Sequence, residues 1–411
     1  MMASLPNHPR RGVPMNKALA VAVVLLGALA TGFASDKETV LHTFTFGSGD
    51  GNTPFGGLVA DAAGNLYGTT AGGGLLNGGT VFELSPASGG WTETILYSFP
   101  SMTYPYSSLI FDAAGNLYGT TYQGGAHGGG SAFELSPAAG GGWTETTIYS
   151  FGGVLKGATD TAGPPVVDSS GNLYGIAGGG LYGGGMVYKL TPSASGNWTE
   201  TDLYDFNGFP YGNLILDSAG NIYGATEYGQ IFELTPSSYG TYPAILYAFT
   251  GGTDGADPRA GLTWDAEGNL YGTTTSGGPY GYGVVFKLTP KTHGGWREST
   301  IHAFTGGADG ANPAATLTFD AAGNLYGTAL LGGAHGYGTV FKLTHGPLGG
   351  WIEGTLHAFT GGSDGSGPIS SVMIDSGGNI YGTTGWGGST TTCSGSGCGV
   401  VYELSPTSTA R

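Results

Sequence analysis

The sequence predicts an all-β protein, a seven-bladed β-propeller of four-stranded blades, from three observations. Glycine accounts for 84 of the 411 residues, and aromatic residues make up 12% of the chain. Glycine is a poor helix former and marks turns, whereas aromatic residues favour strands. One phrase occurs seven times, with 48 to 56 residues between successive copies, and a period near fifty is typical of propellers and other repeat arrays. Each repeat also contains segments for four short strands, which is the content of one blade.

The composition excludes several other classes of protein. Glycine without a three-residue period excludes collagen, and the aromatic content is too high for a chain that stays unfolded. The 12 basic residues are outnumbered by 28 acidic ones, for a net charge of −16. A protein that binds a phosphate backbone needs clustered Lys and Arg, so nucleic acid is not an expected partner.

The N-terminal segment has the features of a secretory signal peptide. Basic residues precede an apolar run from Ala18 to Ala30, and Gly32 and Ala34 offer small residues for cleavage. A membrane anchor is the alternative, but the run barely reaches spanning length and glycines interrupt it. We therefore expect residues 1–34 to be a signal peptide and residues 35–411 to be a single exported domain, periplasmic or extracellular. No membrane span is expected in the mature chain.

The repeated phrase reads Asp-Ala-Ala-Gly-Asn-Leu-Tyr-Gly at residues 61–68. Its seven copies are centred on Asn65, Asn116, Asn172, Asn221, Asn269, Asn324 and Asn379. The Gly-Asn pair suits a tight hairpin, where φ must be positive. In the second copy the expected strands are Ser107–Asp112, Leu117–Thr121, Ser131–Ser136 and Trp143–Phe151. Gly68 lies inside a strand, which predicts that backbone or a bulky aromatic packs against it.

The two ends of the chain complement each other. The seventh copy stops after its third strand, Val400–Leu404, while Thr39–Phe44 matches the fourth-strand segment Thr94–Phe99 of the first copy. We expect residues 39–46 to form the outer strand of the last blade. That pairing would close the ring and remove an exposed sheet edge.

The repeat phrases D-x-x-G-N-[LI]-Y-G-T-T, G-T-V-F-[EK]-L and W-T-E-T-x-[LI]-Y-x-F resemble those of the GloVer tandem-repeat family of exported bacterial proteins. The resemblance covers essentially all of residues 38–405. It implies propeller-like repeats and export, and it implies no catalytic residues because no activity is assigned to that family.

Two cysteines, Cys393 and Cys398, lie in a Ser/Thr/Gly loop before the last strand of the seventh copy. In an exported protein this spacing predicts a disulfide. A metal site would need more ligands, and no His or acidic residue lies between Gly388 and Val401.

Several histidines and aromatic residues are candidate ligand-binding residues. They lie in glycine-flanked loops between the second and third strands: His127, His335, Tyr280 and Trp386. Such loops face solvent and can bind ligands, although ordinary variation in a polar loop would give the same pattern. By contrast, His42, His302 and His357 occupy a position that is Tyr in other copies, which indicates a structural role.

Four aspartates share the pattern Asp-Gly-x-x-Pro just before a first strand, in copies one, five, six and seven: Asp50, Asp254, Asp309 and Asp364. These copies are adjacent on a closed ring, so the aspartates would form an acidic arc on the face that carries the other candidates. Ca²⁺ could bridge them, but its sites need six or more oxygens. No other cofactor is expected. The alternative is a repeated turn in which Asp makes a local hydrogen bond.

Two functions are compatible with these observations. The first is an exported, non-catalytic binding or scaffold propeller that holds a glycan or another cell-surface component on its loop-rich face. The second is a carbohydrate-active enzyme, a polysaccharide lyase or glycoside hydrolase, which rests on fold analogy alone. The first is favoured because a lyase needs basic groups that this chain has in short supply. The oligomeric state does not follow from the sequence.

Overall fold

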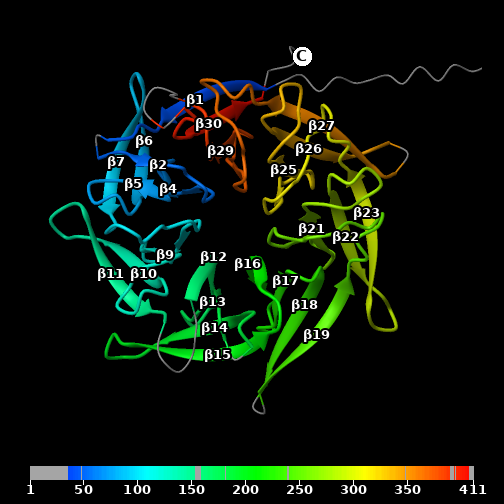
Figure 1. The fold of residues 1–411 in the computed structure, drawn as a ribbon, viewed down its shortest axis with the longest axis horizontal. Helices are drawn as coiled ribbons and strands as arrows, with labels where there is room; N and C mark the ends of the chain where they lie inside the picture. The colour runs from blue at the N-terminus through cyan, green and yellow to red at the C-terminus, as the bar shows by residue number, and fades with distance from the viewer. Residues whose placement is uncertain are drawn as a thin grey trace, which may run out of the picture. The chain divides into compact units, whose positions relative to one another are not determined.

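A computed structural model describes residues 36–47, 49–152, 159–180, 182–237, 240–347, 349–388, 393 and 395–406. Every regular element in these residues is a strand, and the strands form seven four-stranded antiparallel sheets. The sheets are arranged as the blades of a seven-bladed propeller (Figure 1). The predicted fold class is thus confirmed. The expected signal peptide, residues 1–34, lies outside the described residues.

Blades 1 to 4 follow one another along the chain. Their strands are β3 (Val59–Ala60), β4 (Leu66–Thr70), β6 (Thr80–Ala87) and β7 (Gly90–Ser98) in blade 1, then β8 (Ile110–Phe111), β9 (Leu117–Thr121), β10 (Ser131–Pro137) and β11 (Trp143–Ser150) in blade 2. Blade 3 contains β12 (Thr159–Val167), β13 (Leu173–Gly178), β14 (Gly185–Pro192) and β15 (Trp198–Phe206), and blade 4 contains β16 (Pro210–Leu216), β17 (Ile222–Thr226), β18 (Gln230–Ser237) and β19 (Gly240–Ala248). A small extra ladder joins β2 (Gly51–Asn52) to β5 (Gly72–Gly73).

Blades 5 to 7 repeat the arrangement. Blade 5 contains β20 (Thr263–Trp264), β21 (Leu270–Thr274), β22 (Val284–Pro290) and β23 (Trp296–Ala303), and blade 6 contains β24 (Thr318–Phe319), β25 (Leu325–Ala329), β26 (Thr339–His345) and β27 (Trp351–Ala358). Blade 7 is built from β28 (Met373–Ile374), β29 (Ile380–Thr384), β30 (Val400–Ser405) and β1 (Lys37–Thr43). The last blade therefore combines segments from the two ends of the described chain.

The pairing of β1 with β30 is antiparallel and runs from Lys37 opposite Ser405 to Thr43 opposite Val400. The strand ends three residues before the predicted boundary at residue 46, because the chain turns at residues 46–47. The backbone N–H of Phe44 still donates to the carbonyl of Gly399 at 3.1 Å.

The first strand is only two residues long in blades 1, 2, 5, 6 and 7. In blade 2 the ladder contains only Ile110 and Phe111, where the sequence predicts a strand from Ser107 to Asp112. The preceding residues bond to neighbouring segments instead. Thr69 Oγ1 donates to the carbonyl of Ser107, and the N–H of Gly57 donates to Ser108 Oγ. These small residues therefore tie neighbouring blades together around the axis.

The Asp-x-x-Gly-Asn phrase forms the hairpin between the first two strands. Asp61 accepts hydrogen bonds from the backbone of Ala63 and Asn65, from the Asn65 amide and from the Tyr67 hydroxyl. Gly64 supplies the positive φ of +85°. Partial burial raises the pKa of Asp61, but these hydrogen bonds to the carboxylate outweigh that effect and lower the pKa.

The glycine inside each second strand is required by packing between strands. A Cβ on Gly68 would lie 2.6 Å from Cζ of Phe82, and a Cβ on Gly119 would lie 2.6 Å from Cζ of Phe133. Both phenylalanines are fully buried. The expectation that a bulky aromatic side chain packs on this glycine is confirmed.

The hydrophobic core lies between blades. Each of seven buried clusters joins side chains of two neighbouring blades. Between blades 7 and 1, for example, Phe44 and Val401 pack with Leu66 and Phe82. Each blade is thus stabilised by its two neighbours, as expected for an array of repeats.

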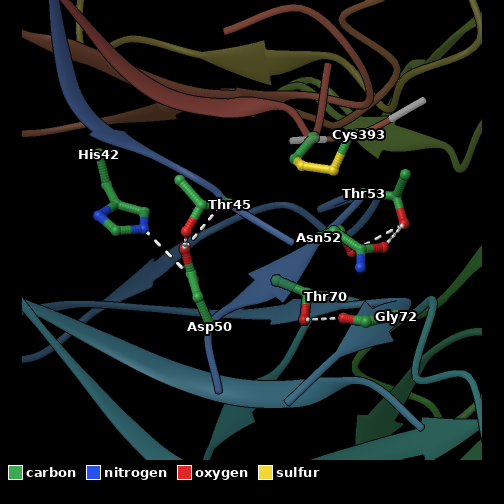
Figure 2. Close-up of a disulfide and its surroundings, with 9 residues drawn as sticks. His42, Thr45, Asp50, Asn52, Thr53, Thr70, Gly72 and Cys393 are labelled. Carbon is green, nitrogen blue, oxygen red and sulfur yellow. Dashed lines mark hydrogen bonds and ion pairs between the residues drawn. A yellow bond between two sulfur atoms is a disulfide. The ribbon is translucent and has the colours of Figure 1, made fainter. Parts of the chain in front are cut away.

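The predicted disulfide is present. Cys393 and Cys398 are bonded, with their Cα atoms 5.3 Å apart, and Cys398 belongs to the buried cluster between blades 7 and 1. The carbonyl of Cys398 accepts from the N–H of Thr53 at 2.8 Å. Figure 2 shows this bridge close to the turn that contains Thr45 and Asp50.

None of the described residues forms a helix that is long and apolar enough to cross a membrane.

Candidate functional site

The channel is lined by the short segments that precede the first strands and, in blades 3 and 4, by residues of the first strands themselves. All seven blades contribute to one narrow cavity of about 170 Å³. Most of its lining is small, including Gly57, Ser108, Gly163 and Gly261. This volume is below the range of about 300–1,000 Å³ that is typical of small-molecule sites, so a ligand of that size has to lie over the end of the channel.

A proline precedes one position of these segments in six blades, and the side chain at that position is large in five of them. The residues at that position are Phe55, Tyr106, Tyr211, Arg259, Ala314 and Ile369. The residue before the proline has positive φ in several blades: Thr53, Tyr104, Asp257 and Asn312, at 52° to 55°. In these four blades the residue after the proline lines the channel cavity.

Five aromatic rings form one contiguous cluster there, which we call the aromatic platform: Trp386, Phe55, Tyr106, Tyr104 and Tyr122. The ring of Phe55 lies 5.7 Å from that of Trp386 and 5.6 Å from that of Tyr106. Tyr106 in turn lies 6.2 Å from Tyr104 and 5.5 Å from Tyr122. Phe55 and Tyr106 also line the channel cavity, so the platform borders the channel.

The platform is accessible to solvent. Tyr106 is 39% exposed, and Tyr122 and Trp386 are each 36% exposed. Burial and the neighbouring hydroxyls of Tyr104 and Tyr122 raise the pKa of Tyr106, so its hydroxyl remains a hydrogen-bond donor at neutral pH. The platform therefore offers apolar ring surface together with polar groups.

A basic residue lines the same cavity from blade 5. Arg259 is exposed, and its guanidinium carbon lies 5.2 Å from the ring centre of Tyr211 in blade 4. Among the described residues that line the channel cavity, Arg259 is the only charged one.

The four predicted aspartates lie at the outer strands and not at the channel. Each accepts hydrogen bonds from the backbone N–H and hydroxyl of the threonine that starts its turn: Thr45, Thr250, Thr305 and Thr360. Each also faces a ring on the preceding outer strand: His42, Tyr247, His302 and His357, at 2.9 to 3.5 Å. These aspartates thus serve local turns.

Asp254 shows the electrostatic consequence of this arrangement. Burial raises its pKa, but the hydrogen bonds from Thr250 and Tyr247 outweigh that effect and lower it. The carboxylate is therefore stabilised by its own turn without any ligand.

The three remaining candidates lie at exposed loop tips on different blades: His127 after β9, Tyr280 after β21 and His335 after β25. Of the predicted ligand-binding residues, only Trp386 joins the aromatic platform. Sequence reasoning missed Phe55, Tyr106 and Arg259. The available signal was the residue after the proline, which is large in some copies although its neighbours are small in nearly all.

The fold and this face define the chain as a seven-bladed repeat propeller with an aromatic, loop-bearing face around a narrow channel. The chain belongs to the Gloeobacter/Verrucomicrobia repeat family, whose model matches residues 94–263 and 225–411. The predicted family resemblance is confirmed. No match was found among curated proteins.

Several solved structures have a similar fold. The extracellular domain of a protein assigned to a one-component system of B. thetaiotaomicron has a TM-score of 0.54 and 12% identity, over 88% of this chain and 40% of that chain. This chain therefore spans less than half the length of that protein. The WD40 propeller domain of Doa1 has a TM-score of 0.54 and 13% identity, over 91% of this chain and 98% of that one. A protein assigned as a 6-phosphogluconolactonase from Bacteroides uniformis has a TM-score of 0.50 and 13% identity, over 76% and 86%. At such identities the likeness shows the fold alone.

Proposed function

We propose that this protein is an exported binding propeller that holds a glycan on the aromatic platform. The observation that carries this proposal is the run of five contacting rings at the channel, with Tyr106, Tyr122 and Trp386 each at least one third exposed. Aromatic side chains supply large, rigid contact area with polar tips, which suits the alternating apolar and hydroxyl surfaces of a sugar ring.

The charge at the channel supports the same ligand class. Arg259 can donate up to five hydrogen bonds in a fixed planar geometry, and it can pair with a carboxylate on an acidic sugar. No carboxylate accompanies it among the described lining residues. A glycoside hydrolase would need two carboxyl groups on either side of the bond to be cleaved, so this lining favours binding over hydrolysis.

Export is part of the proposal. It is supported by the predicted signal peptide at residues 1–34 and by the bond between Cys393 and Cys398, since disulfides persist mainly in oxidising compartments. WD40 and extracellular-domain propellers among the structural neighbours are compatible with a binding or scaffold role.

Affinity electrophoresis in native gels tests the proposal. The gels would contain single polysaccharides such as xylan, laminarin, pectin or alginate, and the proteins would be the wild type, Trp386→Ala and Tyr106→Ala. Tyr280→Ala is the matched control, because Tyr280 is 59% exposed in a loop of the same kind but lies outside the platform.

We expect at least one polysaccharide to retard the wild type and the Tyr280→Ala variant. The Trp386→Ala and Tyr106→Ala variants should bind at least about fivefold more weakly, since truncating a central aromatic residue of a binding site costs more than about 1 kcal/mol. If Tyr280→Ala loses as much affinity as Trp386→Ala, the ligand contacts the loop tips and the platform proposal is wrong.

A further inference from the structure

Three side chains of different types meet at the junction of blades 7 and 1, away from the aromatic platform. His42 lies on β1, Asp50 lies in the turn that follows, and Glu93 lies on β7. His42 Nε2 is 3.5 Å from Asp50 Oδ1 and 3.6 Å from Glu93 Oε1. In the described parts of the chain, this is the one group of His, Cys, Asp or Glu whose three ligand atoms all lie within 4.8 Å of one another.

These three atoms are buried but make no hydrogen bond. His42 Nε2, Asp50 Oδ1 and Glu93 Oε1 are each inaccessible to solvent and each lack a hydrogen-bond partner. Asp50 as a whole is only 9% exposed. Separations of 3.5 and 3.6 Å are too long for hydrogen bonds. At these separations His42 makes ion pairs with both carboxylates when it is protonated. Buried polar atoms nearly always have hydrogen-bond partners in native proteins, and a cation between these three atoms would satisfy all of them.

The hydrogen bonds of the turn before Asp50 explain why its Oδ1 has no hydrogen-bond donor. The backbone N–H and the hydroxyl of Thr45 both donate to Oδ2 of Asp50, at 2.7 and 2.9 Å. In the equivalent turn of blades 5 and 6, the N–H of Thr305 donates to Oδ2 of Asp309, whereas the Thr305 hydroxyl donates to Oδ1. His302 there faces Oδ2, which the backbone already uses.

The two turns differ in length by one residue. Four residues lie between Thr45 and Asp50, but three lie between Thr305 and Asp309. After the longer turn, Oδ2 of Asp50 accepts both hydrogen bonds from Thr45, and Oδ1 faces His42. Figure 2 shows the His42 ring and the Thr45 side chain facing this carboxylate.

The two separations from His42 Nε2 fit a shared metal ion, and the three residues can bring their ligand atoms within 4.8 Å of one another. With ligand bonds of about 2.0–2.2 Å, two ligands of a tetrahedral Zn²⁺ lie about 3.3–3.6 Å apart. One neutral imidazole and two carboxylates would also neutralise the charge of a divalent ion. We propose that His42, Asp50 and Glu93 form a binding site for a divalent transition metal ion, with Zn²⁺ as the best match.

The site would have an open position. Asp50 and Glu93 also line a cavity of about 720 Å³, whose other walls include Leu75, Leu76 and Tyr97. Three protein ligands with a fourth position free for water or another ligand is the arrangement of reactive zinc centres, whereas structural zinc sites are closed by four protein ligands. The bound ion would therefore lie beside this cavity, behind the walls that Asp50 and Glu93 contribute.

Metal binding to untagged, oxidised protein tests the proposal, because a histidine tag or free thiols would bind the ion themselves. After removal of metals with a chelator, Zn²⁺ would be titrated by calorimetry, and Co²⁺ would be followed by its visible absorption. The key variant is Glu93→Gln. The matched control is Glu353→Gln, since Glu353 holds the same position at the junction of blades 5 and 6, beside Asp309.

We expect about one Zn²⁺ per chain for the wild type and for Glu353→Gln, with a Co²⁺ band typical of four or five ligands. Glu93→Gln should bind at least tenfold more weakly and lose that band, while its far-ultraviolet circular dichroism stays unchanged. Absence of stoichiometric Zn²⁺ binding to the wild type overturns the proposal. Equal affinity in the wild type and Glu93→Gln also overturns it, because the ion would then lie elsewhere.

Discussion

The junction between blades 7 and 1 and the junction between blades 5 and 6 contain the same three side-chain types. The first has His42, Asp50 and Glu93, and the second has His302, Asp309 and Glu353. In the first junction the turn before the aspartate is one residue longer, and three buried ligand atoms face one another. In the second, both oxygens of the aspartate are used by its own turn. A repeat can therefore acquire a new site through the length of a turn, without any new residue type.

The largest expected effect comes from removing one side of the first junction. Deletion of residues 36–46 removes β1, together with Leu41 and the fully buried Phe44. We expect the unfolding free energy to fall by about 5 kcal/mol or more, because the deletion removes two buried side chains and the hydrogen-bonded pairing of β1 with β30. Urea denaturation measures this loss. An unchanged midpoint would mean that β1 does not support the last blade.

Two equivalent substitutions measure the effect of losing one buried side chain without losing the strand. Phe44→Ala and Phe304→Ala remove equivalent, fully buried rings from the two junctions. Each should cost about 3–5 kcal/mol. A much smaller cost for Phe44→Ala would show that blade 7 is held less firmly than blade 5.

The disulfide distinguishes the first junction from the second. Cys398 packs in the cluster between blades 7 and 1 and its carbonyl accepts from Thr53. Replacing both cysteines by serine should lower the unfolding free energy by about 2 kcal/mol, the value that loop-closure entropy gives for so short a loop. The same denaturation curves measure it, with and without reductant. A wild type that is insensitive to reductant would contradict this expectation.

Turn length can be tested directly at the metal site. Deletion of Gly47 shortens the turn between Thr45 and Asp50 to the length found between Thr305 and Asp309. We expect Zn²⁺ affinity to fall at least tenfold, about 1.4 kcal/mol, because Asp50 Oδ1 would return to its threonine. Calorimetric titration measures the change. Retained affinity in a folded variant would show that the ligand geometry does not depend on the extra residue.

The smallest expected loss of stability comes from the hairpin aspartates, and it should be equal in blade 1 and blade 6. The hairpin aspartates Asp61 in blade 1 and Asp320 in blade 6 accept equivalent hydrogen bonds. Partial burial raises the pKa of each, but these bonds outweigh it and lower the pKa. We expect Asp61→Ala and Asp320→Ala each to cost about 1–2 kcal/mol at pH 7.

The pH dependence of that cost has a definite sign. A carboxyl group whose pKa is lower in the folded state stabilises the fold above its unfolded pKa, here 3.8. The contribution disappears as the pH falls through the lower, folded value. The difference between each variant and the wild type should therefore shrink in denaturation curves at pH 2 to 3. A difference that persists there would assign the effect to packing.

The repeat pattern was sufficient to predict the fold. Comparison of the seven copies with one another predicts the blades, the Gly-Asn hairpin and the packing on Gly68. The short spacing of Cys393 and Cys398 predicts their bond. The length of the first strands was not predictable, because Ser107 and Ser108 are compatible with a strand but bond to neighbouring blades instead.

The candidate sites were harder to predict because they lie where the copies differ. Phe55, Tyr106 and Arg259 occupy one position of the repeat, and a comparison that looks for shared residues passes over it. Sequence reasoning interpreted His42 as structural, named Asp50 only as one of four aspartates that Ca²⁺ could bridge, and did not consider Glu93. Only the three-dimensional structure shows that His42 faces both Asp50 and Glu93.

The ladder between β1 and β30 joins Lys37 to Ser405, which are almost the whole chain apart in sequence. During synthesis β1 emerges before the other described strands, and its partner β30 emerges after them. Contacts between such distant residues form slowly, because a very long loop must close before they contribute any stability. Until then both strands present open edges that could pair with another chain. We therefore expect blade 7 to fold last and refolding yield to decrease with protein concentration.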